Sequence, residues 1–287
     1  MLFTLAYSAV DNSVQFHQID PAGNVARTFA IDVGAPTMIH DFVLTERYIV
    51  LIAAPAIFDL NAARAGKPML QWQPERGTRI GLIALDGSAA TWLETDAFLA
   101  FHLGNAFERG GHILVDYVRH DRLNLGYQSL NQKAPTLHRL DIEVAGRTVS
   151  DAQMAGMVTE FPRVNDALNA LPTRYVYLPT LSDTLRLTNP PSATFNTMMK
   201  VDTETGAIVQ HDFGNRIAGE AAFIPRRAGG REDDGYVATF AFDPVAGTSD
   251  FVLLDAAHLS DGPVAVVRMP QRVPQGLHGN WMPTTAS

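Results

Sequence analysis

Apolar and polar positions alternate along most of the chain, and turn-forming residues interrupt this alternation at short intervals. Short runs rich in β-branched and aromatic residues between such turns are typical of β-strands. The expected strands lie at 2–8, 14–19, 26–32, 80–85, 90–94, 98–103, 111–118, 135–142, 147–153, 174–178, 197–201, 207–211, 235–243, 250–255 and 264–269. Helical periodicity is almost absent, so the pattern predicts an all-β protein built as a sandwich, barrel or propeller. No repeat of fixed period selects among these three.

Two stretches depart from this pattern. Residues 55–79 form the only long irregular segment, within which 58–65 are expected to make two helical turns that end at Gly66 and Pro68. A long insertion of this kind is typical of a lid or tunnel wall. The glycine- and charge-rich run at 226–235 predicts an exposed loop.

Composition excludes several classes of protein. The chain has 287 residues, 46% hydrophobic and 18% charged, enough for one large domain or two smaller ones. A formal net charge of −8 without any basic stripe argues against a nucleic-acid partner. The sequence contains no cysteine, which excludes disulfides and thiolate metal sites. No signal peptide and no transmembrane run of about 18 apolar residues is recognisable, so a cytoplasmic protein is expected.

Histidines in apolar or glycine-rich surroundings are the candidate functional residues of this chain. His40 ends an apolar approach and is followed by Asp41 and the strand-like run at 47–52. Taken alone, it is either a core histidine satisfied by one hydrogen bond or a metal ligand. His102, His278 and Glu160 stand in three further motifs, at 101–108, 276–281 and 160–165. Imidazole and carboxylate are the strong metal ligands left in the absence of cysteine, and they suit iron, zinc or manganese.

Together the four motifs resemble the carotenoid cleavage oxygenase family, which includes the bacterial lignostilbene dioxygenases and the retinal pigment epithelial proteins. The resemblance runs over essentially the whole chain. It implies a seven-bladed β-propeller with a metal on the central axis, and a single domain over 1–287. It also implies a mononuclear Fe(II) held by four histidines, with His40, His102 and His278 matching three of them. Glu160 and Glu220 match the family's glutamates that hydrogen-bond metal histidines, although Ala221 stands where the family usually has proline.

The resemblance further implies a dioxygenase that cleaves a carbon–carbon double bond of a carotenoid, apocarotenoid or stilbenoid to two carbonyl products. Its partners would be dioxygen and a small apolar conjugated substrate, and no protein acid, base or nucleophile would be required. Apolar walls suit such a substrate. Trp72, Phe107, Phe161 and Trp281 are candidates for these walls or for ordinary core positions. The choice between apocarotenoid and stilbenoid stays open, as does the oligomeric state.

One motif of the family is absent. Its first iron histidine lies in an Ala-His-Pro context, which this sequence does not contain. We therefore expect an incomplete propeller that lacks the N-terminal blades. His17 is the only histidine upstream of His40, and its context does not match. The other histidines lack motif context and are expected to be structural or exposed: His112, His120, His138, His211 and His258.

Two interpretations from different classes follow. The chain is either an iron dioxygenase given without its N-terminal part, or a shortened, inactive homologue that acts only as a binding or inert fragment. Isomerisation coupled to ester cleavage is a third possibility within the family, disfavoured by the lack of a membrane-binding segment.

Overall fold

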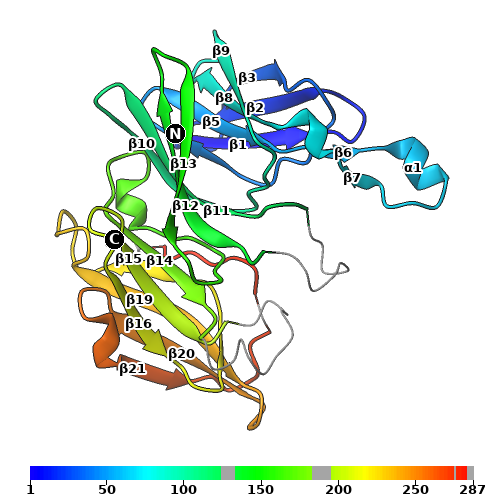
Figure 1. Ribbon diagram of the computed structural model, residues 1–287. Helices are drawn as coiled ribbons and strands as arrows, with labels where there is room; N and C mark the ends of the chain where they lie inside the picture. The colour runs from blue at the N-terminus through cyan, green and yellow to red at the C-terminus, as the bar shows by residue number, and fades with distance from the viewer. Residues whose placement is uncertain (124–132, 183–194, 275, 283–287) are drawn as a thin grey trace.

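The computed structural model describes residues 1–123, 133–182, 195–274 and 276–282, and antiparallel sheets dominate these ranges (Figure 1). The first sheet has the order β1 (Leu2–Tyr7), β2 (Ser13–Ile19), β3 (Val25–Asp32). The second has the order β4 (Phe42–Leu44), β5 (Tyr48–Ala53), β8 (Thr78–Ala84), β9 (Ala90–Thr95). The third has the order β10 (Leu103–Arg109), β11 (His112–Arg119), β12 (Thr136–Glu143), β13 (Thr148–Ala155).

The C-terminal half continues in the same way. The fourth sheet has the order β14 (Tyr175–Thr180), β15 (Thr197–Asp202), β16 (Ile208–Asp212). The fifth has the order β17 (Ile217–Ala218), β19 (Gly235–Asp243), β20 (Thr248–Asp255), β21 (Pro263–Arg268), with β18 (Ala222–Pro225) also paired to β19. Short helical pieces are η2 (Asp166–Leu168) and η3 (Leu259–Asp261). None of the helices in the described ranges is long and apolar enough to cross a membrane.

Consecutive sheets pack against one another through four apolar clusters. Along β5, Ile49 and Leu51 face the first sheet, whereas Val50 and Ile52 face the third. This is the period-2 alternation of a strand with both faces buried. Each cluster contains residues of two consecutive sheets, for example Phe16 and Leu51, Ile80 and Val115, Leu137 and Leu178, and Met198 and Leu254. The all-β prediction is confirmed, and the core is a series of layers between sheets.

The strand predicted at 98–103 is wrong. Strand β10 begins at Leu103 and pairs with β11 across Gly110 and Gly111, whose φ angles are 59° and 87°. Glycine adopts positive φ at little cost, so this dipeptide makes a two-residue hairpin turn. The partner of β11 must therefore end directly before Gly110. The apolar run at 98–100 is buried in irregular backbone instead.

The insertion at 55–79 is more regular than predicted. Strands β6 (Ala56–Phe58) and β7 (Leu70–Trp72) form a hairpin arm that carries α1 (Leu60–Arg64), and η1 (Pro74–Arg76) follows (Figure 1). The predicted helical turns are confirmed. The Asp59 carboxylate caps them by accepting from the backbone N–H of Asn61 and Ala62, each at 2.9 Å. The arm leaves the second sheet between β5 and β8, close to the segment that carries His40.

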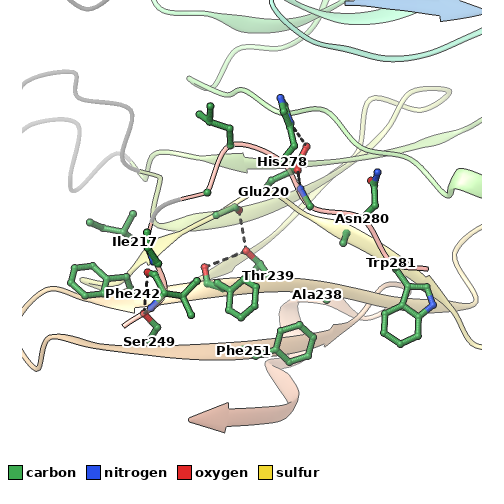
Figure 2. Close-up of a pocket in the computed structure, with 18 of the residues that line it drawn as sticks. Ile217, Glu220, Ala238, Thr239, Phe242, Ser249, Phe251, His278, Asn280 and Trp281 are labelled. Atoms are coloured by element: carbon green, nitrogen blue, oxygen red, sulfur yellow. Dashed lines mark hydrogen bonds and ion pairs between the residues drawn. The ribbon is translucent and has the colours of Figure 1, made fainter. Parts of the chain in front are cut away.

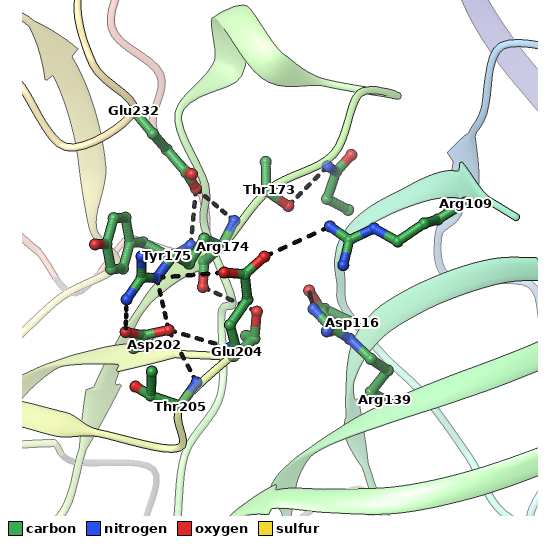
Figure 3. Close-up of polar contacts among 12 residues, drawn as sticks. Arg109, Asp116, Arg139, Thr173, Arg174, Tyr175, Asp202, Glu204, Thr205 and Glu232 are labelled. Atoms are coloured by element: carbon green, nitrogen blue, oxygen red, sulfur yellow. Dashed lines mark hydrogen bonds and ion pairs between the residues drawn. The ribbon is translucent and has the colours of Figure 1, made fainter.

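The loop at 226–235 is only partly exposed. Residues 226–229 face solvent, as predicted. Glu232 turns inward instead, and one carboxylate oxygen accepts from the backbone N–H of Arg174 and Tyr175 at 2.8 and 2.7 Å (Figure 3). Lys200, which is 7% exposed, donates to Asp233 at 2.9 Å. The acidic half of the loop therefore attaches the fifth sheet to the fourth.

A buried ion pair between β11 and β12 yields a stability prediction. Asp116 is fully buried, and Arg139 opposite it donates to both carboxylate oxygens, at 2.7 and 2.8 Å (Figure 3). Arg139→Met should lower the free energy of unfolding by about 3–5 kcal/mol, because it leaves a buried charge without a partner. Replacing both residues together, by Leu and Met, should restore most of that loss. Urea denaturation followed by circular dichroism measures both.

Glu204 provides the matched control. Its half-exposed carboxylate lies 3.6 Å from Arg109 and 3.8 Å from Arg174, so Glu204→Gln should cost less than about 1 kcal/mol. Equal losses of unfolding free energy in Glu204→Gln and Arg139→Met would contradict the claim that burial makes the Asp116–Arg139 pair costly to break.

Candidate metal centre

Three histidines that are far apart in the sequence lie side by side in the structure. His40 precedes β4, His102 immediately precedes β10, and His278 lies in the C-terminal segment at 276–282. The ring centroid of His102 is 4.9 Å from that of His40 and 4.9 Å from that of His278. Imidazoles that share one ion at about 2.0–2.1 Å place their centroids roughly 4.5–5.3 Å apart. The spacing of both pairs therefore suits the binding of one shared metal ion.

The three rings use the same nitrogen for a protein hydrogen bond. In each case Nδ1 faces an oxygen acceptor, so the neutral ring donates from Nδ1 and carries its lone pair on Nε2. The contacts are His40 to the Phe101 carbonyl at 2.9 Å, His102 to Glu160 Oε2 at 2.5 Å, and His278 to Glu220 Oε1 at 3.3 Å. This arrangement leaves all three Nε2 atoms as possible metal donors.

The three histidines lie close together but do not form a complete metal-binding arrangement. Within the residues described, no three histidine, aspartate or glutamate side chains already have the compact arrangement of a bound ion. Burial lowers the pKa of His40 below its usual value, and the neighbouring His102 acts in the same direction. Both effects favour the neutral form that a metal requires.

Glu160 is a buried carboxylate with three donors. Its Oε2 accepts from His102 and from the backbone N–H of Phe161 at 2.7 Å, and its Oε1 faces His120 Nε2 at 2.5 Å. Burial by itself would raise the pKa of Glu160, but the hydrogen bonds from both histidines outweigh it and lower the pKa to about 2. Phe161 adopts a positive φ of 55°, and its ring centroid lies 4.7 Å from that of His102. Pro162 packs closely against Gly104, and a Cβ at position 104 would lie 3.3 Å from the Pro162 side chain.

Glu220 plays the corresponding part at His278. Its side chain is 7% exposed, and it accepts from His278 and from the backbone N–H of Gly279 at 2.8 Å. Arg163 lies 3.4 Å from the same carboxylate and also donates to the side chain of Asn280. The C-terminal segment is therefore attached to the site through Glu220 and Arg163. The alanine at position 221 leaves these contacts in place.

Asp41 connects the segments that carry two of the histidines. Its carboxylate accepts from the backbone N–H of Phe42 at 2.8 Å and of Leu103 at 2.9 Å. Burial raises the pKa of Asp41, although the two N–H donors act in the opposite direction. The hydrogen bond from His40 to the Phe101 carbonyl is a second connection between the same two segments. These contacts therefore hold the segment before β4 against the segment before β10.

An apolar pocket of about 360 Å³ opens beside His278. It lies between the fifth sheet and the C-terminal segment, with His278 and Glu220 at one end and Phe251 and Trp281 away from them (Figure 2). Phe240 and Phe242 also line it. Two of the other predicted wall residues lie elsewhere: Phe107 is fully buried within β10, and Trp72, at the end of β7, packs against the cluster that contains Ala56 and Leu99.

The sequence missed one histidine of this site. His120, expected to be structural or exposed, contacts Glu160, and no local pattern marks it because the contact depends on how β11 ends. Three other histidines form side-chain contacts outside the site: His17 on β2 faces Thr28 on β3 at 2.9 Å, and His112 and His138 pair with Asp141 and Asp151. The His211 ring packs against Phe213.

Known proteins resemble this chain over most of its length. Residues 1–283 match the family described as retinal pigment epithelial membrane protein. The carotenoid 9,10(9′,10′)-cleavage dioxygenase 1 of Pisum sativum is 29% identical over 96% of this chain and 54% of its own length. The chain therefore spans about half of that relative.

Solved structures show the same fold. Cobalt-substituted apocarotenoid oxygenase from Synechocystis matches with a TM-score of 0.87 and 26% identity, over 98% of this chain and 60% of its own. The lignostilbene dioxygenase of Pseudomonas brassicacearum matches with a TM-score of 0.90 at 24% identity, over 98% of this chain and 63% of its own. With nearly every residue of the chain inside the match, the protein belongs to the retinal pigment epithelial membrane protein family, that of the carotenoid cleavage oxygenases.

Proposed function

We propose that the protein is a non-haem Fe(II) dioxygenase that cleaves a carbon–carbon double bond of a carotenoid, apocarotenoid or stilbenoid to two carbonyl products. The observation that carries this proposal is the shared orientation of His40, His102 and His278. Each ring is hydrogen-bonded at Nδ1, which leaves the lone pair on Nε2, and the centroid of His102 lies 4.9 Å from those of His40 and His278, a spacing that suits one ion. The names of the relatives supply the reaction class.

The donor set fits a divalent transition metal. Neutral imidazoles bind iron, zinc, copper and nickel, so ligand type alone does not single out iron. Membership of the family favours iron, and a relative solved with cobalt makes Co²⁺ a suitable probe. Glu160 and Glu220 lie where the outer partners of metal-bound histidines are expected, which orients the rings and raises their basicity.

The residues of this chain have three tasks in such a reaction. Glu160 and Glu220 keep His102 and His278 in the tautomer that presents Nε2. Phe161, against both His102 and His278, excludes water from the reacting side of the centre. The pocket beside His278 offers apolar walls to a conjugated substrate. Bound Fe(II) with an open position would supply dioxygen activation next to an electron-rich double bond, and both oxygen atoms would enter the products.

The architecture extends the proposal. The five sheets pack face to face in chain order, and we assign them as consecutive blades of the family's seven-bladed propeller, one domain over residues 1–287. An inactive binding fragment is the alternative, and no observation favours it over the dioxygenase.

Glu160→Gln should weaken Fe(II) binding by roughly 10–100-fold, because the amide cannot replace the charge that faces His102. Anaerobic competition against a chromophoric chelator measures this affinity. Glu108→Gln is the control, since this carboxylate accepts from Thr45 and Arg47 away from the site. Equal iron affinity in the wild-type chain and Glu160→Gln would exclude the outer-shell role.

Oxidative cleavage provides the direct test of function. The iron-loaded protein, supplied with an apocarotenoid or a stilbene under ¹⁸O₂, should release two carbonyl products that both carry ¹⁸O. His102→Ala should abolish both metal binding and cleavage, whereas His112→Ala, which removes a half-exposed histidine outside the site, should retain both. The assay should include a version extended by any in-frame upstream sequence. Iron binding without cleavage in either version would establish the inactive alternative.

A further inference from the structure

A second histidine holds the carboxylate that orients His102. His120 directly follows β11, and its backbone N–H and C=O pair with those of Leu99 at 2.8 and 2.9 Å. Its side chain is 14% exposed, and its Nε2 lies 2.5 Å from Glu160 Oε1. The Phe101 ring packs edge-on against it, with centroids 5.0 Å apart. His120 is therefore fixed through its backbone, its ring face and one ring nitrogen.

The contact fills a position that a buried carboxylate cannot leave empty. Glu160 Oε2 has two donors, His102 and the backbone N–H of Phe161. The structure gives Oε1 one donor among the described residues, His120. An unpaired buried acceptor is costly, so without His120 the carboxylate would turn to seek another donor or water. Such a rotation would move Oε2 away from His102 Nδ1.

The other glutamate of the site is supported in the same way. Glu220 faces His278, and Arg163 lies 3.4 Å from the same carboxylate oxygen. Each glutamate thus has one histidine of the centre and one additional donor side chain. The backbone N–H of Val118, two residues before His120, also donates to the His102 carbonyl at 3.2 Å. The end of β11 therefore supports His102 through both main chain and side chain.

We propose that His120 is a positioning residue for the metal centre. Its Nε2–H donates to Glu160 Oε1, keeps Oε2 directed at His102 Nδ1, and so holds His102 in the tautomer that carries its lone pair on Nε2. This inference rests on the proposed function for its metal, but the orientation of His102 can be measured without one.

Three substitutions separate positioning from packing. His120→Gln keeps a donor at about the reach of the ring Nε2, whereas His120→Asn is too short to reach Glu160 and His120→Leu has no donor. Co²⁺ affinity should fall by roughly tenfold in the Leu and Asn variants, the lower end of the range for outer partners, and by less than about threefold in the Gln variant. His138→Leu is the matched control, because this 15% exposed histidine faces Asp151 outside the site. It should leave Co²⁺ affinity unchanged.

The metal-free protein supplies the second readout. Long-range ¹H–¹⁵N spectra of the histidine rings should show His102 protonated at Nδ1 in the wild-type chain and in His120→Gln. The Asn and Leu variants should show a mixture of tautomers at His102. Circular dichroism verifies that each variant is folded. If His120→Leu is unfolded, the comparison of His120→Asn with His120→Gln decides the question of positioning.

The outcomes distinguish this inference from the proposed function. An unaltered His102 tautomer in His120→Asn overturns the positioning role, as does equal behaviour of the Asn and Gln variants. If the wild-type chain binds no Co²⁺ but the tautomer changes as expected, the positioning role stands and the metal function falls.

Discussion

The burial of both faces of the second, third and fourth sheets is the constraint on which the remaining structure depends. Strand β5 sends alternate residues into two different apolar clusters, so the second sheet must lie between the first and the third. The same relation recurs at β14, where Val176 and Leu178 enter one cluster and Tyr177 the next. Sheets with two apolar faces must stack, and stacking brings the segments at their ends together. His40 and His102 lie on two such segments.

Polar contacts then determine how these ends meet. Asp41 holds the amide of Leu103, and Glu160 holds His102 from one side and His120 from the other. These groups are buried, so each must satisfy its hydrogen bonds within the protein, and each has few ways of doing so. The result is a set of histidines whose ring orientation is defined by the fold. An induced change of tautomer would be needed to bind a metal in any other way.

Glu160 shows how a largely apolar interior can contain an ionised carboxylate at the candidate metal centre. Burial opposes the charge of Glu160, yet hydrogen bonds from two histidines hold its pKa low. At Glu220, Arg163 donates to the carboxylate at 3.4 Å. The donors at each carboxylate thus offset the cost of its burial and also fix its direction, which joins local stability to the geometry of the site.

The sequence by itself determined the all-β class, because alternation along a strand reflects contacts with its immediate neighbours. It also indicated His40, His102, His278 and Glu160, since each lies in a motif that can be read locally. The tertiary structure decided where β10 begins, because the Gly110–Gly111 turn sets the pairing and overrides the apolar run at 98–103. It also decided the contact of His120, which has no local signal and reaches Glu160 only because β11 ends beside it. Distances between rings depend on how sheets stack, and no short-range pattern contains that information.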